Sequence, residues 1–140
     1  MHNSVIYVRA VLPRRRVSKL KKLLEEGSVE GEVARDVLRA LIVFGGSLWA
    51  SELEDAVNRV KLGRVEYAWD RKIVEKVLKK LQGIGVVSVE KRVRASDKAG
   101  GEKDSLIRLV SGEARQILGS DRVLNEYFAS TLRSLREKEG

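Results

Sequence analysis

Cations at helical spacing are the side chains of this sequence best suited to chemistry, and that chemistry is the binding of phosphate groups. The apolar residues of the segment 70–82 recur at helical spacing, which predicts a helix with one buried side. Basic residues occupy the opposite side, where they can attract phosphates. The residues expected on this outward side are Lys72, Lys76 and Lys79, with Arg71 and Lys80 at its borders and Glu75 as its one acidic residue. Taken singly, each lysine is better explained as part of a solvated helix surface.

Catalytic chemistry has few residues to draw on. The chain has no cysteine, which excludes disulfides, cysteine-ligated zinc, iron–sulfur clusters and a cysteine nucleophile. The single histidine is His2, at the N-terminus, so imidazole catalysis and histidine metal sites are not expected. We therefore expect a protein that is not an enzyme and that uses no cofactor and no metal.

The composition predicts one soluble, basic domain. The 140 residues include 28 Lys and Arg against 20 Asp and Glu, a formal charge of +8, and 43% of them are apolar. A chain of this size can bury about 70% of its unfolded surface without disulfide or metal support. No apolar run approaches the roughly 20 residues that span a bilayer, and the first residues lack the layout of a signal peptide. We expect a cytoplasmic protein without membrane contact, whose composition resembles that of hyperthermophile proteins.

The positive charge is concentrated near the N-terminus. Residues 1–28 carry seven basic and two acidic residues, whereas residues 112–140 carry five of each. A basic amphipathic helix is predicted over 14–26, after a short strand or extended arm over Val5–Leu12. Additional candidates for phosphate contact are Arg14, Arg15 and Arg16. A core-packed helix with a solvated basic face explains this segment about equally well, and membrane binding is a third alternative.

Three helices are predicted in the middle of the chain. Their expected ranges are 32–44, 51–62 and 70–82, with an extended bridge at 47–50. Ser51 and Glu54 have the spacing of a capping box, which satisfies free backbone amides in the first turn, and Asp70 is placed to cap the third helix. The residues expected on the polar side of the first helix are Arg35, Asp36 and Arg39.

A β-hairpin is predicted after the third helix. Apolar and polar residues alternate over 87–94, which is the pattern of a half-buried strand. A polar, glycine-containing loop then leads to a second short strand over Leu106–Val110. The predicted fold class is therefore mainly α with a small antiparallel β-hairpin, an α+β arrangement.

The order of these elements resembles the winged helix-turn-helix superfamily of DNA-binding proteins, to which many transcription regulators belong. The resemblance covers about residues 32–110 and is carried by SLWASELEDAV, KIVEKVLKKLQGIGVVSVEKRVR, the polar loop and LIRLV. It implies that the helix at about 70–82 enters the DNA major groove and that the wing, 93–105, reaches the backbone or the minor groove. The groove-facing residues that the resemblance implies are Arg71, Lys72, Glu75, Lys76 and Lys79, and the implied wing contacts are Arg92, Arg94, Lys98 and Lys103. The connector Lys61–Ala68 departs from the pattern, because it is longer than the turn of a compact helix-turn-helix.

The C-terminal residues predict a homodimer. In a helix over 121–138 the apolar residues cover about half of the circumference, which is more than contact with one neighbour requires. The expected interface residues are Leu124, Tyr127, Phe128, Leu132 and Leu135. The alternative is that these residues only complete the core of a monomer. The chain then comprises a basic N-terminal arm and helix (1–28), a winged helix-turn-helix (29–111) and C-terminal dimerisation helices (112–140), in one compact unit.

These expectations together describe a dimeric protein that binds double-stranded DNA as a transcriptional regulator. A symmetric dimer would place two recognition helices in successive major grooves about 34 Å apart. One alternative is a winged-helix interaction module of a transcription or replication complex, whose basic faces serve solubility. Another is an RNA-binding or ribosome-associated protein, although the sequence lacks clustered aromatic residues for stacking on unpaired bases.

Overall fold

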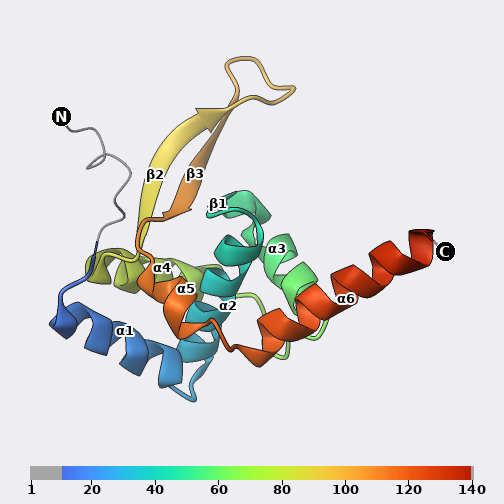
Figure 1. The fold of residues 1–140 in the computed structure, drawn as a ribbon. Helices are drawn as coiled ribbons and strands as arrows, with labels where there is room; N and C mark the ends of the chain where they lie inside the picture. Colours follow the sequence, from blue (N-terminus) through green and yellow to red (C-terminus); the bar gives the residue numbers. More distant parts are fainter. Residues whose placement is uncertain (1–10, 140) are drawn as a thin grey trace, which may run out of the picture.

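A computed structural model describes residues 11–139, and most of the strand or arm expected over Val5–Leu12 lies outside this range. The described chain is mainly helical with one small antiparallel sheet, which confirms the predicted class (Figure 1). The helices are α1 (Arg14–Glu25), α2 (Val29–Val43), α3 (Leu53–Val60), α4 (Arg71–Ile84), α5 (Glu113–Ile117) and α6 (Arg122–Glu139), with a 3-10 turn η2 (Ala50–Glu52). The strands are β1 (Ser47–Trp49), β2 (Val87–Arg94) and β3 (Glu102–Leu109).

Helix α2 forms the centre of the core. Its sequence is apolar around most of the circumference, and Val33, Val37, Leu38 and Leu41 are fully buried. Helices α1, α3 and α4 each pack an apolar side against it. Burial of one such side chain stabilises the fold by about 1.5–3 kcal/mol, so packing around α2 fixes the position of all three neighbours.

The two ends of α4 are set by local chemistry. At the N-terminus, Asp70 caps the helix as predicted, because its side chain accepts hydrogen bonds from the backbone amides of Lys72 and Ile73. At the C-terminus, Gly85 has φ +96°, which ends the helix in a left-handed conformation. A Cβ at Gly85 would lie 3.2 Å from both Arg16 Nη1 and Leu12 Cδ2. Glycine is therefore required here by the backbone conformation, and a Cβ would in addition press on the side chains of Leu12 and Arg16.

The predicted capping box at Ser51 and Glu54 is wrong. Ser51 lies in η2, and its hydroxyl donates a 2.5 Å hydrogen bond to Asp104 Oδ2 of β3 instead. Helix α3 begins at Leu53 without a side-chain cap. A carboxylate is a stronger acceptor than a neutral partner, so the long-range bond to Asp104 displaces the local one.

The sheet has strand order β1-β3-β2, with both pairings antiparallel. The bridge after α2 is thus a true strand, since Leu48 pairs with Ile107. Strand β3 begins at Glu102, four residues before the predicted start at Leu106, and pairs along the whole of β2. The far half of this hairpin extends beyond the core, where Val93 is 62% exposed (Figure 1).

A buried polar cluster joins α2 to α6 and to the connector between α3 and α4. Asp36 is 1% exposed and lies 2.7 Å from Arg39 Nη1, and it accepts hydrogen bonds from Lys61 and Tyr67 at 3.1 and 2.9 Å. Arg39 also makes a two-point contact with Asp121, which caps the start of α6. The expected exposure of Asp36 and Arg39 on a polar face is therefore wrong, because α6 and the connector cover that side of α2.

Helix α6 leaves the body of the molecule soon after it begins (Figure 1). Leu124 in its first turn is buried, whereas Phe128, Leu132 and Leu135 are 46%, 56% and 52% exposed. Among residues 11–139, no helix combines the length and apolar character that crossing a membrane requires.

Candidate nucleic-acid interface

The outer side of α4 is basic, and its centre carries free charge. Lys72 and Lys79 lie opposite the buried stripe of the helix, and both are exposed. Within the described part of the chain neither makes an ion pair. Arg71 is also exposed, and its guanidinium lies 3.8 Å from Glu75 one turn later. An exposed pair at this distance is weak, so Arg71 remains able to reach an external partner.

The side of α4 that faces the start of α2 is partly neutralised. Glu30 of α2 lies 2.8 Å from Lys76 Nζ through one carboxylate oxygen and 2.7 Å from Lys80 Nζ through the other. Hydrogen bonds from these two lysines lower the pKa of Glu30 from 4.5 to about 2, and the same contact raises the pKa of Lys80. Lys76 is thus held by an internal anion, whereas Lys72 and Lys79 are not.

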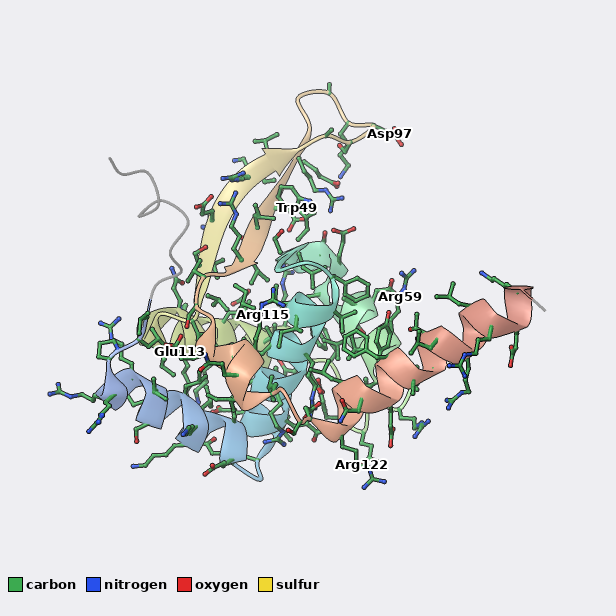
Figure 2. All side chains as sticks on the ribbon, viewed as in Figure 1. Trp49, Arg59, Asp97, Glu113, Arg115 and Arg122 are labelled. Atoms are coloured by element: carbon green, nitrogen blue, oxygen red, sulfur yellow. The ribbon has the colours of Figure 1, made fainter. Side chains whose placement is uncertain are left out.

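The four expected wing cations do not gather on one surface. Three of them are engaged within the chain: Arg92 lies 2.6 Å from Glu90, Lys98 lies 3.0 Å from Glu102, and Arg94 contacts several groups. In the antiparallel register, Arg92 and Arg94 share one side of the hairpin, while Lys103 lies opposite Val93 and belongs to the other. Lys98 is in the tip, close to Asp97, which marks that tip in Figure 2.

Arg94 fastens the hairpin to the rest of the domain. Its guanidinium lies 5.0 Å from the ring centre of Trp49, 3.3 Å from Asp104 Oδ2 and 3.1 Å from Ser51 Oγ. Trp49 appears beside the hairpin in Figure 2, below the tip. Burial acts to raise the pKa of Asp104, but hydrogen bonds from Ser51, from the Ser105 amide and from Arg94 outweigh it and hold the pKa below its usual value. The Asp104 carboxylate that contacts Arg94 is therefore ionised at neutral pH.

The N-terminal arginines lie at the start of α1. Arg14, Arg15 and Arg16 are all exposed, and within residues 11–139 none of them makes an ion pair. Arg16 approaches Gly85, where α4 ends. Arg15 and Arg16 therefore lie beside one end of α4, a position that the sequence did not indicate, whereas Arg14 does not line the space between α1 and α4.

The expected interface residues of α6 fall into two groups. Leu124 is buried against the core and Tyr127 is half-buried, with its ring 5.6 Å from that of Phe128 in an edge-on arrangement. Phe128, Leu132 and Leu135 form an exposed apolar row along one side of the projecting helix. Burial of Leu124 thus serves the monomer, while the exposed row is available to a partner.

Sequence reasoning missed the carboxylates that control these surfaces. Glu30 and Lys80 are separated by 50 residues, and Ser51 and Asp104 by 53, so no local pattern joins either pair.

The described residues contain no group of three or more His, Cys, Asp or Glu that could hold a metal ion. The chain matches no protein-family model, and a search of the curated proteins finds no match to it.

Proposed function

We propose that the protein is a winged helix-turn-helix protein that binds double-stranded DNA, with α4 in the major groove, and that it acts as a transcriptional regulator and not as an enzyme. The element order α2-β1-α3-α4-β2-β3 supports this proposal, because it is the order of helices, extended bridge and hairpin on which the resemblance rests, and β1 joins the hairpin in one sheet. In such a domain the helix before the hairpin enters the groove, and the hairpin contacts the flanking DNA.

The observation that carries the proposal is the free positive charge at the centre of the outer side of α4. Lys72 and Lys79 project from α4, the helix that comes directly before the hairpin in the sequence. No carboxylate within the described residues neutralises them. Lysine favours contact with phosphates over the reading of bases, while Arg71 and Glu75 have the chemistry to contact guanine and cytosine. We therefore expect binding with a large electrostatic contribution.

The wing takes a smaller part in this proposal than the sequence suggested. Arg94 is committed to Trp49 and Asp104, and Arg92 and Lys98 each have an acidic neighbour. Lys91 and Lys103 lie on the opposite side of the hairpin and are exposed without an ion pair in the described structure. The hairpin's best candidates for a backbone contact are therefore Lys91 and Lys103.

The exposed row of α6 supports the proposal of a homodimer. Phe128, Leu132 and Leu135 recur at spacings of four and three residues, which is the spacing of a helix-pairing seam. Two copies joined along α6 would present two α4 helices to one DNA duplex. A protein-interaction module is the second candidate function, and the observation in its favour is the same row, because a different protein's helix would also cover it.

The test is fluorescence anisotropy with duplex DNA, duplex RNA and single-stranded DNA over a series of salt concentrations. We expect duplex DNA to bind best, with a log–log salt slope of about −0.9 per phosphate contacted. Lys72→Glu with Lys79→Glu should weaken binding by at least about 100-fold, since two contacts are lost and replaced by repulsion. Arg133→Glu with Arg136→Glu makes the same charge change on α6 and should leave the affinity within about threefold. Absence of duplex binding at low salt would favour the interaction module.

A further inference from the structure

A basic groove lies between α1 and the C-terminal end of α4. Its volume is about 630 Å³, and it is open to solvent along one side. Within residues 11–139, the cations that line it are Arg15, Arg16, Lys19 and Lys22 of α1 and Lys80 of α4, against one carboxylate, that of Glu26. Figure 1 shows α1 lying across the same side of the molecule as the end of α4 that leads into β2.

Most of the positive charge of this groove has no ionic partner among residues 11–139, since of the five cations only Lys80 is paired there, with Glu30. The four cations from α1 make no ion pair among residues 11–139, and the Glu26 carboxylate accepts a hydrogen bond from Ser28. Basic residues also crowd the first turn of α1, which contains no acidic residue. A helix N-terminus carries partial positive charge, and like charges one turn apart repel, so this arrangement works against the stability of α1. An external anion would relieve it.

The shape and chemistry of the groove favour a backbone with repeated phosphates. One side of α1 carries three cations over about 10 Å, namely Arg15, Lys19 and Lys22. One strand of duplex DNA carries a phosphate about every 3.4 Å along its axis, so this row is long enough to contact more than one phosphate. Among the described residues that line the groove, none is an aromatic on which a base could stack, and the apolar side chains are those of Leu23 and Ile84. A small apolar ligand or an unpaired nucleotide would find few partners.

The groove also continues the charged side of α4. Lys76 and Lys80 are one turn apart on that helix, and Lys80 belongs to the groove while Lys76 borders the free lysines at the centre of the outer side. One strand of a duplex that contacts α4 and extends into the groove would pass Lys76 and Lys80, where it competes with Glu30 for these two lysines.

We propose that the α1–α4 groove holds the sugar–phosphate backbone of the same DNA duplex, beside the base pairs that α4 faces. This inference rests on the proposed function. Arg15, Lys19 and Lys22 bind phosphates along one strand, and Arg16, which packs over Gly85, holds α1 against the end of α4. The groove adds affinity for any duplex sequence and contributes nothing to the reading of bases.

The test compares two variants of α1 that lose the same charges. Arg15→Gln with Lys19→Gln removes two cations from the groove. Arg14→Gln with Lys21→Gln removes two exposed cations of α1 that do not line it, because Arg14, although the sequence suggested it as a phosphate contact, lies outside the groove. With a mixed-sequence duplex, the groove variant should lose on the order of tenfold in affinity per contact at about 0.1 M salt, and its salt slope should fall by about two. The control variant should keep the slope and affinity of the wild type.

The outcomes separate the inference from the proposed function. If the wild type binds duplex DNA and Lys72→Glu with Lys79→Glu abolishes binding, but the two α1 variants behave alike, the groove is not a backbone site and only the inference fails. If the wild type does not bind duplex DNA, both fail. A third outcome is that Arg15→Gln with Lys19→Gln weakens binding of a poly-glutamate peptide but leaves DNA binding unchanged. This result would assign the groove to an acidic protein and overturn the inference. Circular dichroism melting confirms that each variant is folded.

Discussion

Glu30 Oε2 lies 2.7 Å from Lys80 Nζ, and this contact joins the first turn of α2 to the basic side of α4. The second oxygen of the same carboxylate lies 2.8 Å from Lys76. Glu30 therefore places one negative charge against two of the lysines that border the proposed DNA surface. A duplex that approaches this side of α4 must compete with Glu30 for them.

Removal of this carboxylate should strengthen DNA binding. Glu30→Gln frees Lys76 and Lys80 and removes a repulsive charge, so we expect the affinity for a mixed-sequence duplex to rise by about three- to tenfold, as measured by anisotropy. Glu137→Gln makes the same change on the projecting part of α6 and should have little effect. Equal affinity of Glu30→Gln and the wild type would show that DNA does not approach this side of α4.

The same contact predicts a pH dependence of stability. The pKa of Glu30 is about 2 in the folded protein, against an ordinary value of 4.5, because Lys76 and Lys80 hydrogen-bond to its ionised form. The stabilisation is therefore complete above about pH 5 and is lost as the pH falls from 4.5 towards 2. In urea unfolding, the difference in midpoint between the wild type and Glu30→Gln should be constant from about pH 7 to 5 and should shrink below that. A difference that does not change down to about pH 2 would contradict the ion pairing.

The buried cluster should tolerate the loss of its arginine poorly. Burial acts to lower the pKa of Arg39, but hydrogen bonds to Asp121 and Asp36 raise it, so the guanidinium is charged in the folded protein. Arg39→Met would leave two carboxylates with less compensation, and we expect unfolding to become easier by about 3 kcal/mol. The control is Arg59→Met, since Arg59 is exposed and pairs with Asp55 only at 3.6 Å; its expected cost is below about 1 kcal/mol. Similar losses in urea unfolding would show that the buried cluster is no stronger than a surface pair.

Loss of Arg94 should loosen the hairpin. Arg94→Gln removes the contacts with Trp49 and Asp104, so backbone amides near Asp104 should exchange with deuterium at least about fivefold faster. Arg92→Gln removes the same charge from the same side of the strand, but Arg92 pairs only with Glu90 of its own strand. We expect exchange in Arg92→Gln to match that of the wild type. If both variants exchange alike, Arg94 does not fasten the hairpin.

The exposed row of α6 predicts the oligomeric state. Sedimentation should give twice the 15.7 kDa of one chain at micromolar concentration. Leu135→Asp places a charge in the row and should shift the protein to monomers, while Ser134→Asp places the same charge on the adjoining side of α6 and should not. A wild type that sediments as a monomer would exclude self-association through α6 at this concentration.

Periodic patterns in the sequence located most elements but not the contacts between them. The apolar stripe of α4 and its cap at Asp70 are local, so both were predictable. The start of β3 was not, because its first residues, from Glu102 to Ser105, lie in the part of the hairpin beyond the core, where no buried side imposes alternation. The partners of Asp36 and Glu30 were not predictable either. The sequence around a polar residue on a helix does not indicate which distant segment packs against it.

The contact between Arg39 and Asp121 also holds the N-terminus of α6 against α2. Asp121 immediately precedes α6, a helix of 18 residues that is about 27 Å long and mostly exposed beyond Tyr127. A change of about 10° in the direction of α6 at this contact would move the far end of the helix by about 5 Å. In a dimer joined along α6, the spacing between the two α4 helices would therefore depend on this buried ion pair and on the packing of Leu124 against the core.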